Sequence, residues 1–133
     1  MESAHVLGAL IAKFHKAKIE GAPEVTVWGS GRPRREFLYV DDFVSACLFL
    51  MEHYEASDVI NAGSGYDVTI KRLAQMIKEA SAYKGKIIFD ATKPDGTMRK
   101  LLDSSRLHKL GWRPKISLEE GIKKTYQAYA RLP

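Results

Sequence analysis

Two cation-rich stretches that contain glycine constrain this chain more than any other feature. The first covers residues 28–42 and the second covers residues 93–100. Each lies between segments whose apolar residues recur with the spacing of regular secondary structure, so both are expected to be loops held by a core. Loops of this kind can present arginine and lysine to a phosphorylated ligand, because these side chains donate charge-assisted hydrogen bonds to phosphate oxygens.

The spacing of apolar residues predicts nine regular elements. Helices are expected over residues 5–18, 41–51, 70–81, 103–111 and 118–129. Short strands are expected over residues 25–28, 36–40, 59–62 and 86–89. The intervening residues 90–102 are expected to form one long loop, and loops of that length are usually functional or disordered.

This order of elements indicates an α/β or α+β fold, in which a small sheet of short strands is covered by helices. The 133 residues are enough for one domain, spanning residues 1–133. Cys47 lies in an apolar run and is expected to be buried. It is the only cysteine, so no internal disulfide can form, which suits a reducing cytoplasm. No run of eighteen apolar residues occurs, so a membrane span is not expected.

Three arginines in the first stretch, Arg32, Arg34 and Arg35, have two interpretations. They form either a solvated turn or a grip on a diphosphate, whose oxygens match the planar fork of a guanidinium group. Gly29 and Gly31 favour the second interpretation, because glycine lets a backbone approach a ligand closely. The net charge of +5 permits a polyanionic partner without identifying one.

Trp28 and the second stretch also have two interpretations each. Trp28 is either a core residue or a wall of a ligand pocket, where an indole packs against a sugar or a base. The second stretch carries Lys93, Arg99 and Lys100 around a turn signal at Asp95. It forms either a mobile surface loop or a flap that folds its cations over a pocket.

His5 is the histidine with a possible functional role. It shares one helical ridge with Ala9 and Lys13, which places His5 about 12 Å from Lys13 along one face. A surface or capping role is the other interpretation of His5. We interpret the remaining three histidines as structural and residues 63–65 as a simple turn between a strand and a helix. No spacing of cysteine, histidine or carboxylate predicts a metal site.

The specific motifs of these loops resemble a known family. They are residues 27–31 (VWGSG), 35–42 (REFLYVDD) and 93–103 (KPDGTMRKLLD). With the segment that begins at Ser3, they make the whole chain similar to the C-terminal, substrate-binding part of the GDP-L-fucose synthases. These enzymes are extended short-chain dehydrogenase/reductases. The resemblance implies the substrate-binding lobe of such an enzyme, without its Rossmann domain.

The resemblance also implies a reaction and the residues that serve it. The family converts GDP-4-keto-6-deoxy-D-mannose to GDP-L-fucose by epimerisation at C3 and C5 and by NADPH-dependent reduction at C4. His5 matches the acid of the epimerisation, and Arg35 matches the arginine that holds the diphosphate. Trp28 and Lys100 match substrate contacts. Lys13 stands where the family often has arginine, which keeps the charge and loses the planar fork.

The family's NADP-binding Rossmann domain has no counterpart in this sequence. The glycine fingerprint, the reductive serine, tyrosine and lysine, and the partner cysteine of the epimerisation are all absent, and Cys47 is in the wrong place to replace that cysteine. We therefore expect the chain alone to bind no NADP(H) and to be inactive. We also expect an exposed apolar face, and hence a homo-oligomer or association through that face.

Two other functions remain open. The same lobe occurs in epimerases and dehydratases that act on UDP- or dTDP-sugars. A module that binds nucleic acid or another polyanion is the candidate from another class, although the aromatic residues are placed mostly as core residues and not along a cationic groove. We expect a GDP-sugar as the ligand, with neither nucleic acid nor membrane as a partner.

Overall fold

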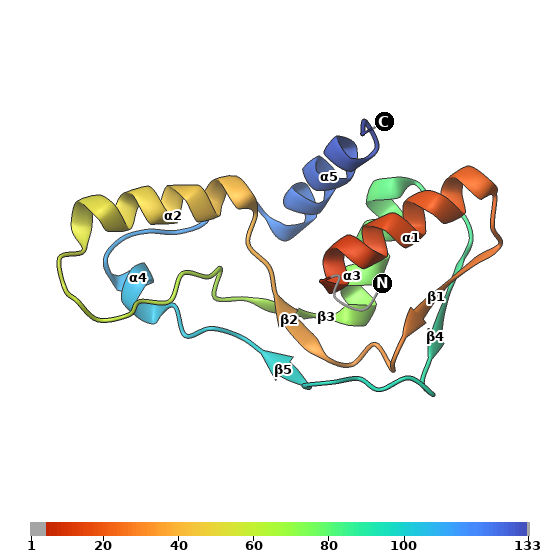
Figure 1. Ribbon diagram of the computed structural model, residues 1–133, viewed down its shortest axis with the longest axis horizontal. Helices are drawn as coiled ribbons and strands as arrows, with labels where there is room; N and C mark the ends of the chain where they lie inside the picture. The colour runs from red at the N-terminus through yellow and green to blue at the C-terminus, as the bar shows by residue number, and fades with distance from the viewer. Residues whose placement is uncertain (1–4, 133) are drawn as a thin grey trace.

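The computed structural model describes residues 5–132, so Ser3 and Ala4 lie outside the described residues. Figure 1 shows how its helices and short strands are arranged. The helices are α1 (Val6–Glu20), α2 (Val40–His53), α3 (Ile70–Ser81), α4 (Ser105–Lys109) and α5 (Leu118–Tyr129). The strands are β1 (Glu24–Trp28), β2 (Arg34–Glu36), β3 (Asp67–Thr69), β4 (Lys86–Asp90) and β5 (Arg99–Lys100). The predicted α/β class is confirmed.

All five predicted helices form, and local capping explains several of their ends. The Thr69 hydroxyl accepts a hydrogen bond from the Arg72 amide (3.1 Å) at the start of α3. The Ser117 hydroxyl accepts one from the Glu120 amide (3.2 Å) at the start of α5. Helix α2 begins at Val40, one residue before its predicted start.

The strands form two small sheets instead of the single sheet that was expected. β1 and β4 pair in parallel, and β2 lies between antiparallel β3 and parallel β5. Strand β2 ends at Glu36, where a strand over residues 36–40 was expected. Strands β3 and β5 were not predicted, because three-residue and two-residue strands carry too little apolar alternation to be detected.

The predicted strand over residues 59–62 is also wrong. These residues are apolar enough for a strand, but no neighbouring strand pairs with them in the part of the chain that the structure describes. A strand needs a partner for its backbone N–H and C=O groups, so the segment stays irregular. Val59 at its start is exposed.

The main hydrophobic core lies between α1, α3, α5 and the β1–β4 sheet. Phe14, Leu73, Ile77 and Ile122 are its most deeply buried side chains. Helix α3 buries five apolar residues in this core, namely Ile70, Leu73, Ala74, Met76 and Ile77. This core fixes α1 and the end of β1, which form two sides of the candidate site.

A second, smaller hydrophobic cluster lies beneath α2, at the other end of the molecule in Figure 1. It is built from Ala46, Leu107 and Trp112. The opposite side of α2 is apolar and exposed. We call it the α2 face, made of Val40, Phe43, Val44, Leu48 and Met51. Cys47 is exposed, so its predicted burial is wrong: the apolar run around it covers both sides of the helix, and only one side is packed.

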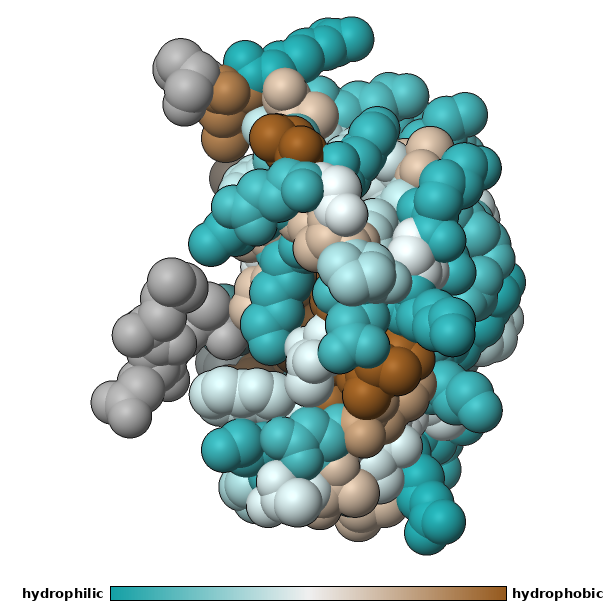
Figure 2. All heavy atoms as spheres, turned by 90° about the vertical axis from the view of Figure 1, so that its right-hand side faces the viewer, coloured by the Kyte–Doolittle hydropathy of each residue, from teal (hydrophilic) through white to brown (hydrophobic). Residues whose placement is uncertain are grey.

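The end of the molecule farthest from α2 has a different surface. Figure 2 shows that this side, which is turned toward the viewer there, is mostly hydrophilic, with small apolar areas near its centre and toward its top. Two exposed apolar side chains of the α1 and β4 region are Ile19 and Ile88. The exposed apolar surface is thus unevenly distributed, and a continuous stretch of it follows α2.

Candidate functional site

A groove of about 240 Å³ runs between α1 and the loop that joins β1 to β2. One wall is the α1 ridge with Ala9 and Lys13, as the helical spacing predicted. The opposite wall contains Trp28, Arg35 and Asp95. The groove therefore brings together side chains from both cation-rich stretches, which lie far apart in the sequence.

Trp28 lies at the mouth of this groove between two lysines. Its side chain is 66% exposed, so it is a wall of the groove and not a core residue. The Lys13 ammonium lies 5.2 Å from the indole centroid, and the Lys93 ammonium lies 5.4 Å from it. Both distances are within the range of cation–π attraction. Lys13 also donates a hydrogen bond to the Thr26 carbonyl (3.1 Å), which fixes its direction.

Asp95 fastens the second stretch to the first. Its carboxylate accepts hydrogen bonds from the Ser30 amide (2.6 Å) and the Ser30 hydroxyl (2.7 Å). The hydrogen bond from the Ser30 hydroxyl has the largest effect and the one from the Ser30 amide the next largest, and together they lower the pKa of Asp95 below its ordinary value. The approach requires glycine at position 29, where a Cβ atom would lie 2.5 Å from the carboxylate. The second stretch is thus folded back, as one of its two interpretations proposed, and Asp95 is a groove residue that we did not predict.

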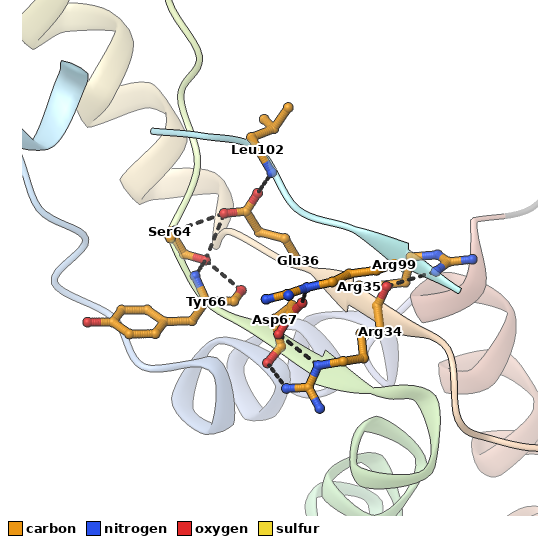
Figure 3. A network of polar contacts seen from close by, with 9 residues as sticks. Arg34, Arg35, Glu36, Ser64, Tyr66, Asp67, Arg99 and Leu102 are labelled. Carbon is orange, nitrogen blue, oxygen red and sulfur yellow. Dashed lines mark hydrogen bonds and ion pairs between the residues drawn. The ribbon is translucent and has the colours of Figure 1, made fainter. Parts of the chain in front are cut away.

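The three-stranded sheet separates the cations into two groups. Arg34 and Arg99 both bind Asp67, whose side chain is only 5% exposed, with Nε–Oδ distances of 2.9 Å and 2.5 Å. Burial opposes ionisation of Asp67, but the hydrogen bonds and charges of Arg99 and Arg34 outweigh it and lower its pKa. Figure 3 shows both guanidinium groups turned toward this carboxylate. These two arginines therefore have a structural role, in which Arg34 donates its Nε and Nη2 groups and Arg99 donates its Nε group to Asp67.

Arg35 and Lys100 form the other group. They are register partners on the parallel strands β2 and β5, so their side chains leave the sheet on the same side. Figure 3 shows Arg35 turned away from Asp67. No carboxylate among residues 5–132 forms an ion pair with either side chain. Arg35 lines the groove and Lys100 lies beside it on the next strand, outside the groove wall.

The glycine loop at residues 63–65 has its own internal anion. Glu36 accepts hydrogen bonds from the Gly65 amide (2.8 Å) and the Ser64 hydroxyl (3.3 Å), and its second oxygen accepts one from the Leu102 amide (3.1 Å). A Cβ atom at Gly63 would lie 2.6 Å from this carboxylate. A phosphate at this loop would have to displace Glu36, which supports the interpretation of the segment as a turn.

His5, Arg32 and two of the other histidines lie outside the groove wall. His5 is exposed at the start of α1, next to a lining residue, and Arg32 is exposed on the loop. His108 lies next to the glycine loop at residues 63–65, where its Nε2 is 3.2 Å from the Gly63 carbonyl oxygen. His15 lies 3.1 Å from the Tyr126 hydroxyl, a structural contact.

A larger hollow of about 750 Å³ lies on another part of the surface. Its lining is mostly apolar and is formed by residues 37–40 and 114–122 together with neighbouring side chains. It contains none of the predicted site residues, and Lys115 is its one lining cation. A phosphorylated ligand needs several donors, so this hollow is a weaker candidate than the groove.

Sequence reasoning missed Asp95, Asp67 and Glu36. Only Asp95 had a local signal, as the single acid between the cations of the second stretch. The described residues contain no group of three histidine, cysteine or carboxylate side chains that could hold a metal ion. Within residues 5–132, no helix combines the length and the apolar character that crossing a membrane requires.

Comparisons with known proteins agree with this picture. Residues 1–63 match the model of the NAD dependent epimerase/dehydratase family. The chain is 57% identical to putative GDP-L-fucose synthase 2 of Arabidopsis thaliana and 51% identical to GDP-L-fucose synthase of Escherichia coli, covering 96% and 94% of this chain. It spans only 39% and 42% of the lengths of these relatives. A crystal structure of a GDP-L-fucose synthetase from Naegleria fowleri bound to NADP superimposes with a TM-score of 0.90 at 32% identity, covering 96% of this chain and 40% of that one.

Proposed function

The chain belongs to the extended short-chain dehydrogenase/reductases and corresponds to the C-terminal part of such an enzyme, and from this premise we propose that it is the substrate-binding domain of a GDP-L-fucose synthase. The reaction of the whole enzyme would be epimerisation and NADPH-dependent reduction of GDP-4-keto-6-deoxy-D-mannose. In this proposal, residues 1–133 hold the GDP-sugar, and another part of the enzyme holds NADP.

The observation that carries the proposal is the pairing of Arg35 with Lys100 beside the groove that contains Trp28. Two cations with no carboxylate partner in the described chain, fixed on neighbouring strands, suit the two phosphates of a nucleoside diphosphate. An exposed indole flanked by Lys13 offers a flat surface to a base or a sugar. His5, at the start of the same helix, would act as the acid of the epimerisation.

The groove accommodates only part of such a ligand. Its volume of about 240 Å³ lies below the roughly 300–1,000 Å³ typical of small-molecule sites. The rest of the substrate would lie against the part of the enzyme that this chain does not include. NADP is assigned to none of this chain's residues, because the sequence contains no dinucleotide fingerprint and its glycine loop already binds Glu36.

Calorimetric titration of the chain with GDP, and separately with UDP, tests this proposal. We expect GDP to bind and UDP to bind more weakly, because the two ligands share the diphosphate and differ in the base. Failure to bind GDP at millimolar concentration would contradict the proposal for this chain. Equal affinities would favour another nucleotide-sugar enzyme. Steeply salt-dependent binding of an oligonucleotide, in place of GDP, would favour a polyanion-binding module.

We also propose that the α2 face is where the rest of the enzyme packs. Relatives are more than twice as long as this chain. Exposed apolar residues follow one side of α2 from Val40 to Met51, and the apolar segment 59–62 nearby has no strand partner in the described chain. A domain that supplied a strand partner for this segment and covered α2 would satisfy both features.

In isolation, the chain is then expected to self-associate through the α2 face. The double variant Leu48→Glu/Met51→Glu should shift sedimentation equilibrium toward monomer, because two charges would have to be buried in the contact. Both side chains are exposed, so the fold should tolerate the change. Ile19→Glu, on the distant hydrophilic end, is the matched control. Association that persists unchanged in the double variant would exclude the α2 face as the contact.

A further inference from the structure

Strand β5 carries one of the two proposed diphosphate contacts, Lys100, yet it is only two residues long. Its ladder with β2 pairs Arg34 with Arg99 and Arg35 with Lys100. One further backbone bond, from the Arg34 amide to the Met98 carbonyl (2.7 Å), extends it. So short a ladder stabilises little by itself. Something else must hold Lys100 beside Arg35.

Two carboxylates hold β5 on both sides of Lys100. Asp67, on β3, binds the Arg99 side chain just before Lys100 and binds Arg34 on β2 with its other oxygen. Glu36, at the end of β2, accepts a hydrogen bond from the backbone N–H of Leu102, two residues after Lys100. Figure 3 shows the contacts of both carboxylates.

We infer that Asp67 and Glu36 are positioning residues, which act on the ligand only through Lys100 and Arg35. Asp67 joins the three strands of the sheet from a side chain that is almost fully buried, where a charged group is stable only when it is paired. Because side chains alternate along a strand, Asp67 holds Arg34 and Arg99 on one side of the sheet, while Arg35 and Lys100 lie on the other side for a ligand. The binding part of this inference rests on the proposed function.

The primary variant is Asp67→Asn. Each guanidinium group binds a different oxygen of the Asp67 carboxylate. The asparagine amide has only one acceptor oxygen, so it cannot accept both hydrogen bonds in this geometry. We expect GDP affinity to fall about tenfold. Lys100→Ala should then weaken GDP binding much less in the Asp67→Asn background than in the original chain, because Lys100 would already be displaced. Glu36→Gln should behave in the same way. Asp58→Asn, at an exposed carboxylate, is the control for the change in charge.

Amide hydrogen exchange supplies a readout that does not depend on any ligand. Asp67→Asn should accelerate exchange at residues 99–102 and leave the core amides of α1 unchanged. If Asp67→Asn does not fold, Arg99→Ala removes one arm of the same bridge from an exposed position and carries the same expectations.

The outcomes separate the positioning role of Asp67 and Glu36 from the proposed binding of GDP. Unchanged GDP affinity in Asp67→Asn, or a full Lys100→Ala effect in that background, overturns the positioning role. If the original chain does not bind GDP, the proposed function fails. Exchange at residues 99–102 then still decides whether the carboxylates hold β5, and unchanged exchange there overturns the inference.

Discussion

Replacing Arg35 with alanine should weaken GDP binding by about 10- to 150-fold. A hydrogen bond to a charged group contributes about 1.5–3 kcal/mol, and every 1.4 kcal/mol corresponds to a factor of ten in affinity. Arg35 lines the groove and forms no ion pair with the described residues, so its removal creates no unpaired carboxylate. The measurement is the dissociation constant of GDP by calorimetry, at a fixed ionic strength because phosphate contacts are screened by salt.

Two further variants separate the shape of Arg35 from its charge. Arg35→Lys should bind GDP with intermediate affinity, because lysine keeps the charge and loses the planar fork. Arg32→Ala changes the net charge equally, on the loop just before β2 and outside the groove, and should bind GDP nearly as well as the original chain. An Arg32→Ala effect as large as that of Arg35→Ala would mean that only the general positive charge of the loop matters.

The local features of this fold could be predicted from the sequence. The caps at Thr69 and Ser117 depend on residues three positions apart, so the pattern alone contains them. Whether residues 59–62 form a strand could not be predicted from a local pattern. Its apolar character was interpreted correctly, but a strand also depends on a neighbour, and the sequence of the segment carries no information about that neighbour.

The candidate site was predictable in its residue types and not in their roles. Both cation-rich stretches were identified, and they do meet at the groove. Which of their cations is available depends on strand register, because alternation sends Arg34 and Arg99 to Asp67 and leaves Arg35 and Lys100 on the other side. That register joins residues more than sixty positions apart, and no local pattern records it.

The groove also depends on the main core, because α1 supplies one of its walls. Phe14, on α1, is fully buried and makes an edge-to-face contact with Tyr83, with ring centroids 5.6 Å apart. Tyr83 in turn donates a hydrogen bond to the Ala22 carbonyl (2.8 Å), just after α1 ends. These contacts fix α1 against α3 and β1, and thereby fix the distance of Lys13 from Trp28.

Phe14→Ala should therefore lower the free energy of unfolding by about 3–5 kcal/mol, through lost burial and the cavity that remains. The free energy of unfolding of a single domain is about 5–15 kcal/mol, so a loss of this size could leave much of the chain unfolded at room temperature. Chemical denaturation followed by circular dichroism measures the change. Phe14→Leu should cost less, because leucine fills most of the space, and Met51→Ala, at an 81% exposed position, should change stability little. A Phe14→Ala variant as stable as Met51→Ala would show that α1 is not held by this core, and the groove could then not be a fixed binding site.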